Sequence, residues 1–369
     1  MAALRFFFYL LMKPAALGFA LLGLVGLLAP FTDPNKWWVP AFSGLFMPLL
    51  LVGNFLLFLF WIFQKKWWAL LPLLTILLNY NFFKAMFQSP WKDLPEISRG
   101  KQITVASYNV EGFYYIARNP QYNIKQFVKD NHIDILCIQE HCEEADLDTN
   151  YIKTRLGLPY RRVFFNRQTD WANFGISIYS RYPIIRYGKI DFNSEKNSSM
   201  WTDIKIQNDT IRVFNNHLQT TDVNINREKY EKYKSVKNWK GQARTLVKLL
   251  GQLKENFQIR AEQARQVREI IDITPYPVIV CGDFNDTPIS FAYNHIKGNH
   301  LLDGFQNCGK GYGHTFNGIK GLLRIDFVAY DTLFKGISYE SPHLPWSDHN
   351  PILMKLSLSS APSPDRTPE

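Results

Sequence analysis

The stretch "VIVCGDFND", residues 278–286, joins a strand of buried character to a cluster of polar side chains. Its first four residues are apolar and of strand type, and the chain then presents Asp283, Asn285 and Asp286. Polar groups are costly to bury without partners, so such a cluster at a strand end needs an explanation. In layered α/β folds, strand ends are where functional sites are built. The stretch therefore predicts an α/β domain with a site at this edge.

The same pattern recurs along the chain from about Lys101 onward. Segments rich in Val, Ile, Phe and Tyr predict strands at 103–110, 133–140, 175–180, 210–218, 277–285 and 323–330. Helical spacing is present at 123–131 and 260–271. Several of the predicted strands, and the segment "WSDHNPI", carry an acid, amide or imidazole that a core does not favour: Asn109, Glu140, His217, Asp283, Asn285, Asp326, Asp348 and His349. We expect these side chains to meet in one site.

The residue types in this set suit one kind of chemistry. Carboxylate oxygens are the ligands that Mg²⁺ prefers, and magnesium commonly bridges protein carboxylates and substrate phosphates. Imidazoles supply charge and a proton for an oxygen leaving group. The set therefore indicates metal-assisted hydrolysis of a phosphoester. Structural alternatives exist for several members. Glu140 and Asp283 could be acids of surface loops, and His217 could be a structural histidine with satisfied hydrogen bonds. Asp326 could simply pair with Arg324 on the same strand.

Six motifs in order, "SYNV", "DILCIQE", "NNHL", "GDFND", "RIDFV" and "SDHNPI", resemble the endonuclease/exonuclease/phosphatase superfamily over about residues 101–357. This superfamily includes deoxyribonuclease I, abasic-site endonucleases, neutral sphingomyelinases and inositol polyphosphate 5-phosphatases. The resemblance implies an α/β fold, a four-layer sandwich of two mixed β-sheets flanked by helices. It also implies Mg²⁺ as the cofactor, with Mn²⁺ as the alternative.

The resemblance further implies a metal-holding group. Asn109 and Glu140 resemble the metal-holding pair, with Glu140 as the direct ligand. Asp348 resembles a second acidic residue near the metal. One position departs from the pattern, because Glu111 follows "SYNV" where many members have Arg, which puts local phosphate affinity in doubt.

The remaining residues resemble the catalytic group of the superfamily. Asp283 resembles the residue that aligns or activates the attacking water, and Asn285 resembles its phosphate-binding neighbour. His349 resembles the histidine that contacts the scissile phosphate and assists the leaving group, and Asp326 resembles the carboxylate that orients it. His217 matches a position that binds a phosphate oxygen. The acidic partner of that residue in some members is not identified, and the candidates are Asp170 and Asp203.

Three apolar segments precede this domain, at 6–28, 37–63 and 67–83. A helix of about 20 apolar residues crosses the hydrocarbon core of a bilayer, which predicts an anchor of three transmembrane helices in residues 1–89. Buried helices of a soluble protein are the alternative. Tryptophans mark the segment ends, as at a membrane interface: Trp37, Trp38, Trp61, Trp67, Trp68 and Trp91.

Charge near the spans predicts the orientation of a multi-pass integral membrane protein. Arg5, Lys65 and Lys66 favour the cytoplasmic side, which would place the catalytic domain outside the cytoplasm. Basic residues after the third span argue the other way: Lys84, Lys92, Arg99 and Lys101. The lipid bilayer is one expected partner, and no obligate protein partner is inferred.

Beyond the anchor we expect a linker at 90–100, a catalytic domain at 101–357 and a disordered tail at 358–369. The domain carries a basic helical insert at 221–257. This insert is either a solvated helical face, a surface for anionic lipid, or a surface for nucleic-acid phosphate.

These features together predict a membrane-anchored, Mg²⁺-dependent phosphoesterase that hydrolyses a phosphodiester by attack of water. The net charge of +10 favours a nuclease-like enzyme acting on nucleic acid. The alternative is a phospholipid or sphingomyelin-type head-group phosphodiesterase or phosphatase, which the anchor favours. A catalytically inactive membrane scaffold is the third hypothesis. The sequence leaves the substrate, nucleic acid or phospholipid, unresolved.

Overall fold

The computed structural model describes residues 2–93, 100–114, 116, 123–144, 156–221, 239–318 and 321–358. The chain divides into two compact units. The helical unit comprises Met1–Lys84, Thr220–Glu262 and Asp286–His295, and the sheet unit comprises Ala85–Gln219, Gln263–Asn285 and Ile296–Glu369. Two segments of the predicted catalytic domain, 220–262 and 286–295, thus belong to the helical unit.

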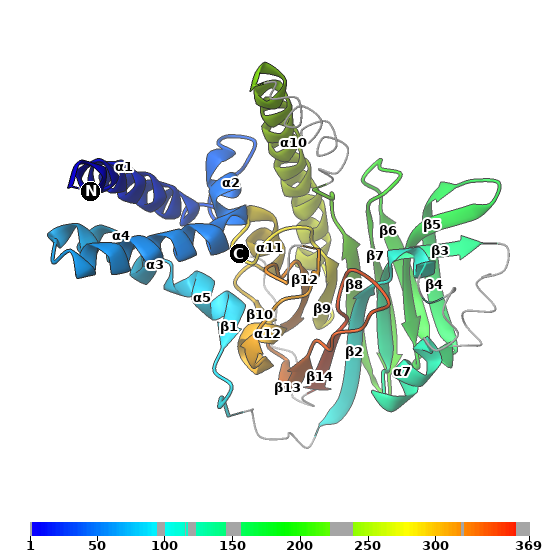
Figure 1. Ribbon diagram of the computed structural model, residues 1–369. Coiled ribbons are helices and arrows are strands. Elements are labelled where there is room, and N and C mark those ends of the chain that lie inside the picture. Colours follow the sequence, from blue (N-terminus) through cyan, green and yellow to red (C-terminus); the bar gives the residue numbers. More distant parts are fainter. Residues whose placement is uncertain are drawn as a thin grey trace. The chain divides into compact units, whose positions relative to one another are not determined.

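The sheet unit holds two six-stranded sheets (Figure 1). The first has the order β13 (Phe334–Glu340), β14 (Ile352–Leu358), β2 (Lys101–Asn109), β3 (Ile135–Glu144), β5 (Ala172–Ser180) and β4 (Tyr160–Gln168). The second has the order β10 (Leu301–Asp303), β12 (Asp326–Asp331), β9 (Val278–Asp283), β8 (Asp209–His217), β7 (Ser198–Ile206) and β6 (Ile184–Ile190). One parallel pair in each sheet, β2–β3 and β8–β9, makes both sheets mixed, as predicted.

The core of the sheet unit includes the inward-facing residues of both sheets. Side chains alternate between the two faces of a strand, so every second residue is available for this layer. Val105 and Cys137 come from the first sheet, and Val213 and Cys281 come from the second, and all four are fully buried. This layer fixes the two sheets face to face and sets the position of their strand ends.

Helices cover the outer faces of the sheets. The helix predicted at 123–131 is α7 (Ile124–Asp130), and Asn123 caps it by accepting a hydrogen bond from the amide of Gln126. Its apolar side packs on the first sheet. At the second sheet, Thr274 follows helix α10 (Trp239–Asp272) and accepts a hydrogen bond from Arg212 of β8. Short elements complete the sheet unit: η2 (Glu111–Phe113), α12 (Gly304–Cys308), and the paired strands β1 (Phe87–Gln88) and β11 (Gly311–Tyr312). Most of α11 (Phe291–Lys297) belongs to the helical unit.

Among the residues of the helical unit that the structure describes, one helix is long and apolar enough to cross a membrane, namely α1 (Ala2–Gly26) over its segment Tyr9–Gly26. The other two predicted spans are each broken. Helices α2 (Val39–Leu45) and α3 (Met47–Phe63) meet at 73°, and the helix Trp67–Leu78, formed by η1 (Trp67–Ala69) and α4 (Leu70–Leu78), meets α5 (Tyr80–Met86) at 50°. Each bent pair is apolar enough only when its two helices are taken together, so the described residues hold one candidate span or up to three.

Local chemistry explains the two breaks. Pro48 lies in the first turn of α3, where it lacks the amide donor that would continue the hydrogen bonding of α2 across the break. Asn79 stands between α4 and α5, and its side chain donates to the carbonyls of Thr75 and Gly23. The amide of Asn79 thus ties the second break to α1.

In the helical unit, several polar side chains are buried and many apolar side chains are exposed, which is the reverse of a water-soluble protein. Asn54, Thr75 and Asn79 are buried, and the amide of Asn54 donates to the carbonyl oxygen of Phe19 at 3.1 Å. Apolar side chains point outward instead, each more than half exposed: Leu17, Leu21, Leu49, Leu56 and Leu77. Helices that pack in lipid show this arrangement, with polar residues between helices and apolar residues outside.

The basic insert and the helix predicted at 260–271 are parts of one element. Helix α10 runs without a break over 34 residues, Trp239–Asp272, and residues 222–238 of the insert lie outside the described residues. In the helical unit, the fully buried Arg260 pairs with Asp286, with 3.0 Å between Nε and Oδ2. Most of the predicted linker, 94–99, and the tail 359–369 also lie outside the described residues.

Candidate functional site

Strand pairing places three of the predicted site residues in one row. His217 at the end of β8 lies opposite Asp283 at the end of the parallel strand β9. Asp283 also lies opposite Asp326, the first residue of the antiparallel strand β12. Residues opposite each other on neighbouring strands point to the same face, so these three side chains share one edge of the second sheet.

The end of β9 and the turn after it need unusual backbone geometry at one position each. Gly282 has φ of 142°, and a Cβ there would stand 2.1 Å from the carbonyl oxygen of Asn216, so only glycine fits between the two strands. Asn285 has φ of 52°, and its amide donates to Oδ1 of Asp283 at 2.8 Å. Its side chain donates to the carbonyl of Leu218 at 3.1 Å. This network fixes the Asp283 carboxylate.

The first sheet contributes Asn109 and Glu140. Asn109 ends β2, and its amide donates to Oε1 of Glu140 and to Oδ2 of Asp283, both at 3.1 Å. Glu140 has φ of 52° and lies where the β3–β5 register shifts, between Ile138 and His141. Such a bulge re-aims a side chain, and the Glu140 side chain is 42% exposed. Asn109 therefore links the ends of the two sheets.

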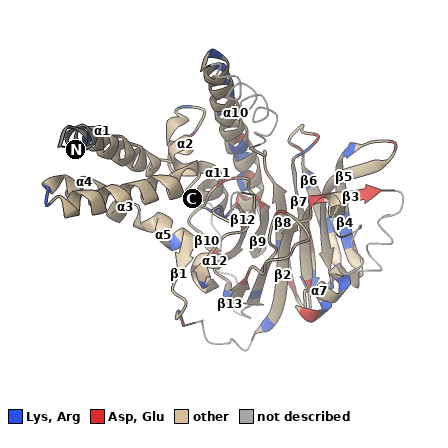
Figure 2. Ribbon diagram, in the orientation of Figure 1, with Lys and Arg blue, Asp and Glu red and all other residues tan. Residues whose placement is uncertain are grey.

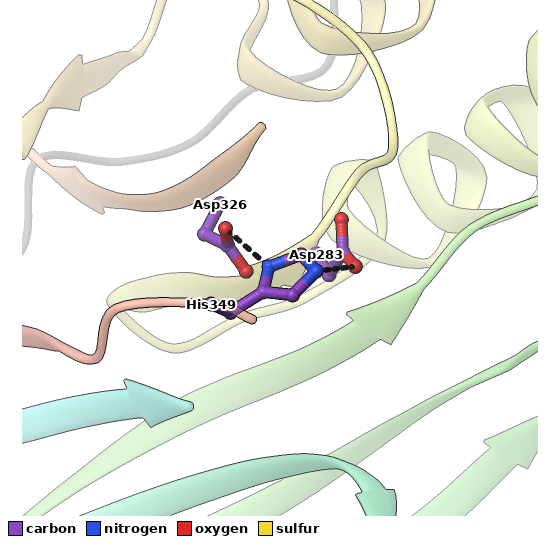
Figure 3. Close-up of side chains that lie close together, drawn as sticks. All are labelled: Asp283, Asp326 and His349. Atoms are coloured by element: carbon purple, nitrogen blue, oxygen red, sulfur yellow. Dashed lines mark hydrogen bonds and ion pairs between the residues drawn. The ribbon is translucent and has the colours of Figure 1, made fainter. Parts of the chain in front are cut away.

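His349 lies between two carboxylates (Figure 3). Its Nδ1 is 2.9 Å from Oδ2 of Asp326, and its Nε2 is 3.6 Å from Oδ2 of Asp283. The structural alternative for Asp326 is wrong, because Arg324 makes a bidentate pair with Asp303 at 3.0 and 2.8 Å. The Asp326 carboxylate is thereby left to hold the imidazole.

Burial and charge shift the pKa values of this group. Burial lowers the pKa of His349, but the carboxylates of Asp326, Asp283 and Asp348 together outweigh it and raise the value to about 10. Burial, and then the charge of Asp326, raise the pKa of Asp283 to about 6, against the opposing effect of the two histidines. At neutral pH the site therefore holds a protonated imidazole beside a carboxylate that can take up a proton.

His217 has two carboxylate neighbours in the site. Its Nε2 is 3.6 Å from Oε1 of Glu140 and 3.9 Å from Oδ2 of Asp283. Neither candidate for its acidic partner fits: Asp203 is buried in a bidentate pair with Arg212, and Asp170 lies in the exposed turn between β4 and β5.

A second group of carboxylates lies beside the first and is more exposed. The amide of Asp348 is 3.4 Å from Oε2 of Glu111, and the Asp348 side chain is 49% exposed. Burial, and then the charge of Asp348, raise the pKa of Glu111. Burial also raises the pKa of Asp348 against the opposing charge of His349, and Glu140 adds to the rise.

Sequence reasoning missed two polar residues that support the site. Ser347 donates to the carbonyl of Asn109 at 2.7 Å and accepts from the amide of His349, so it ties β2 to the catalytic histidine candidate. Gln139 is fully buried and donates to Ser107 and Asn215, which joins the two sheets beneath Glu140. The only sequence signal for Gln139 was an amide inside an apolar strand.

The donor chemistry fits a divalent cation at the exposed end of the site. The buried group Asp283, Asp326 and His349 has ligand atoms within 4.8 Å of one another, but Asp326 already binds the imidazole nitrogen. Partly exposed carboxylates at Glu140 and Asp348 offer the oxygen ligands that Mg²⁺ or Mn²⁺ takes. A phosphate anion approaching this many carboxylates needs a cation beside it.

The buried ion pair beside the site predicts a large effect on stability. Arg324 and Asp303 are 1% and 6% exposed, and Asp303→Asn leaves a buried guanidinium without its carboxylate. We expect this change to lower the free energy of unfolding by about 3–5 kcal/mol in chemical denaturation of the full chain. Asparagine still caps α12 in place of Asp303, so the loss reports the ion pair.

The matched control is Lys189→Gln, which removes an exposed pair with Asp191. This change should cost less than about 1 kcal/mol. Equal small losses in both variants would show that the Arg324–Asp303 pair does not stabilise the sheet unit.

Comparison with known proteins agrees with this geometry. The Endonuclease/Exonuclease/phosphatase family profile matches residues 106–349, and a domain of unknown function, DUF8431, matches residues 5–86. A search of curated proteins found no match.

Solved structures share the fold at low sequence identity. The endonuclease/exonuclease/phosphatase from Bacteroides vulgatus is 19% identical over 70% of this chain and all of its own, with a TM-score of 0.51. A mannosyl-6-phosphatase from Bacteroides thetaiotaomicron is 18% identical over 69% of this chain and all of its own, with a TM-score of 0.50. The human Nocturnin catalytic domain, solved with a bound sulfate anion, is 15% identical over 74% of this chain and all of its own, with a TM-score of 0.50.

These structures show the fold, and the family match covers more than half of the chain. The chain therefore belongs to the endonuclease/exonuclease/phosphatase family and is a hydrolase that acts on phosphoester bonds.

Proposed function

We propose that this chain is a divalent-metal-dependent phosphodiesterase held at a membrane. The observation that carries the proposal is the convergence on one point of Asn109 from β2, Asp283 from β9 and His349 from the segment before β14. The buried hydrogen bond from His349 to Asp326 leaves Nε2 of the imidazole facing the reaction site. This is the arrangement that in-line displacement at phosphorus requires, with a proton acceptor and a proton donor fixed in place.

Each residue has a distinct task in the proposed reaction. Asp283 accepts a hydrogen bond from the attacking water and takes its proton as the bond to phosphorus forms. His349 donates from Nε2 to the phosphate and its leaving oxygen, and Asp326 keeps the imidazole protonated and oriented. His217 and Asn285 lie beside Asp283 and are the proposed contacts to the other phosphate oxygens.

Glu140 and Asp348 would hold the cation, and Asn109 would orient Glu140 through its amide hydrogen bond. When bound, Mg²⁺ or Mn²⁺ stabilises the negative charge that develops on the phosphate. Glu111 lies beside Asp348 and adds one more carboxylate to this end of the site. Its negative charge disfavours substrates that carry additional phosphate groups near the reacting one.

A nuclease-like substrate is the first candidate, because the chain carries a net charge of +10. A phospholipid head group is the second candidate, favoured by the helical unit with its buried Asn54 and outward-facing leucines. A panel of plasmid DNA, RNA, sphingomyelin, phosphatidylinositol phosphates and bis(p-nitrophenyl) phosphate separates them. A substrate is assigned to this site only if its turnover falls at least about a hundredfold in His349→Asn. A folded wild-type enzyme inert toward the whole panel with metal would support the scaffold hypothesis instead.

The proposed anchor consists of α1 and the two bent helix pairs, each pair crossing the bilayer once. In the helical unit, Gln258 of α10 donates to the carbonyl of Pro34 at 3.3 Å. The connection 27–38 therefore lies on the same side of the membrane as α10, which requires an even number of crossings between residue 38 and the sheet unit. Two bent spans satisfy this count, and a single one does not.

We propose further that the catalytic domain is extracytoplasmic, with the amino terminus in the cytoplasm. Reporter fusions at the carboxyl end and at residue 64 would decide the topology. The two reporters should give opposite sides of the membrane. Reporters on the same side would contradict three crossings.

The pH dependence of kcat/KM should be bell-shaped in the metal-loaded enzyme. Activity rises with pH as Asp283, whose pKa burial raises to about 6, loses its proton. It falls again as His349 loses its proton, since carboxylates raise that pKa to about 10. Asp326→Asn removes one of these carboxylates, so the alkaline limb should move to lower pH. An unchanged alkaline limb in this variant would contradict the role of Asp326.

A further inference from the structure

The first half of α10 carries an exposed apolar stripe. Trp239, Leu246 and Val247 are 77%, 52% and 69% exposed. They are spaced by seven and eight residues, which is two helical turns, so they lie on one face of the helix. Ala243 is also exposed and lies on the same face, between Trp239 and Val247. An exposed apolar stripe of this size marks a contact surface.

Basic residues lie close to this stripe along α10, whose ribbon carries blue segments in Figure 2. Lys240, Arg244 and Lys248 repeat every four residues and are all exposed. Residues 239–254 contain four basic residues, the fourth being Lys254, and no acidic one. A helix with an aromatic and aliphatic face, edged by lysine and arginine, has the composition of one that lies in an anionic membrane surface.

The second part of α10 is held against the helices of the proposed anchor. Within the helical unit, Leu253 and Phe257 pack in one cluster with Ala41 of α2. Helix α2 follows α1 through the connection 27–38, where Trp37 is 44% exposed, as tryptophans at a membrane interface are. The end of a membrane-crossing helix lies at the level of the lipid head groups. Contacts within this unit therefore bring α10 to that level.

We propose that residues 239–254 of α10 dock on the surface of an anionic bilayer, with the apolar stripe in the head-group region and the basic side chains on lipid phosphates. This inference rests on the membrane anchoring proposed above. We choose a lipid surface as the occupant because the apolar stripe and the basic residues lie next to each other on the same helix. In addition, this part of α10 belongs to the same unit as helices that expose apolar side chains, as lipid-facing helices do. Nucleic acid would use the basic residues and leave Leu246 and Val247 without a partner.

The test uses the full chain in nanodiscs of phosphatidylcholine, with or without phosphatidylglycerol. The four native cysteines are buried, so an introduced cysteine is the one that an environment-sensitive fluorophore labels. Leu246→Cys reports docking, and Ile273→Cys, 75% exposed just beyond α10, is the matched control. Leu56→Cys on α3, 59% exposed, reports anchoring. Quenching by lipids with a doxyl group on the upper acyl chain measures contact with the bilayer.

Docking predicts a blue-shifted, quenched label at Leu246 in anionic discs and an unquenched label at Ile273. Replacing Lys240, Arg244 and Lys248 with Gln should lower the docking equilibrium on the order of a hundredfold, at about fivefold for each charge. Equal, unquenched signals at Leu246 in both kinds of disc, with quenching at Leu56, would overturn docking while anchoring stands. An unquenched Leu56 label would overturn anchoring and docking together.

Two further outcomes would replace the lipid surface by another occupant. A blue shift at Leu246 that needs added single-stranded oligonucleotide would identify a nucleic-acid surface. A shift that grows with protein concentration in lipid-free detergent would identify a second copy of this chain. Either result would overturn the proposal.

Discussion

His349→Asn lowers kcat for bis(p-nitrophenyl) phosphate by a factor of about 10²–10⁴, which is the range for loss of a positioned proton donor. The imidazole is 5% exposed, and asparagine removes its charge without adding volume. Steady-state rates of the purified full chain with saturating metal measure the effect. KM should change less than kcat, because His349 acts on charge that develops during the reaction.

The control for this variant is His132→Asn. His132 lies in an exposed turn with φ of 49°, a backbone conformation that asparagine adopts readily. Its replacement should leave kcat unchanged. A His349→Asn enzyme that unfolds at the wild-type denaturant midpoint and turns over at the wild-type rate would remove His349 from the mechanism.

Removal of the divalent ion should abolish turnover, and Glu140→Gln should raise the metal concentration needed for half-maximal activity by at least about tenfold. Glu140 is the most exposed of the carboxylates that contact Asn109, and an amide in its place offers a neutral and weaker oxygen ligand. Titration of EDTA-treated enzyme with Mg²⁺ or Mn²⁺ measures the shift.

The matched control is Glu144→Gln, at the last residue of the same strand β3. It should leave the metal requirement of the enzyme unchanged. Identical titration curves for wild type and Glu140→Gln would show that the cation, if required, is held elsewhere.

The strands that carry the site could be predicted from sequence, because strand patterning and polar strand ends are local signals. All six predicted segments are strands, β2, β3, β5, β8, β9 and β12, with ends that differ by a few residues. Their order in the chain also matches the family motifs. Convergence of Asp283 and Asp326 follows once β9 and β12 pair in register.

Other features depend on tertiary contacts that leave no local signal. The bulge that turns Glu140 outward arises from pairing of β3 with β5. The choice of Asp303 as the partner of Arg324 depends on residues that lie 21 positions apart in the chain. Arg212 and Asp203 lie opposite each other on the consecutive strands β7 and β8, so their pairing depends on the register of that hairpin. Sequence patterns left both choices open for this reason.

In the helical unit, the sequence indicated the apolar segments but not the positions at which their helices break. Apolar length was plain in the sequence, but the breaks near Pro48 and Asn79 divide two of the three segments into bent pairs. The 34-residue helix α10 joins a basic segment to a segment whose apolar residues have the spacing of a buried helix face. Because the composition changes in the middle of α10, the sequence does not show that the two segments form one helix.

Binding of Mn²⁺ followed by electron paramagnetic resonance tests the central claim most directly, namely that Glu140, Asp283 and His349 surround a single ion and the phosphate it serves. Saturable loss of the free-ion signal at one ion per chain is expected for wild type and for His349→Asn, whereas Glu140→Gln should bind far more weakly. Undiminished binding in Glu140→Gln, or no binding by active wild-type enzyme, would contradict the account.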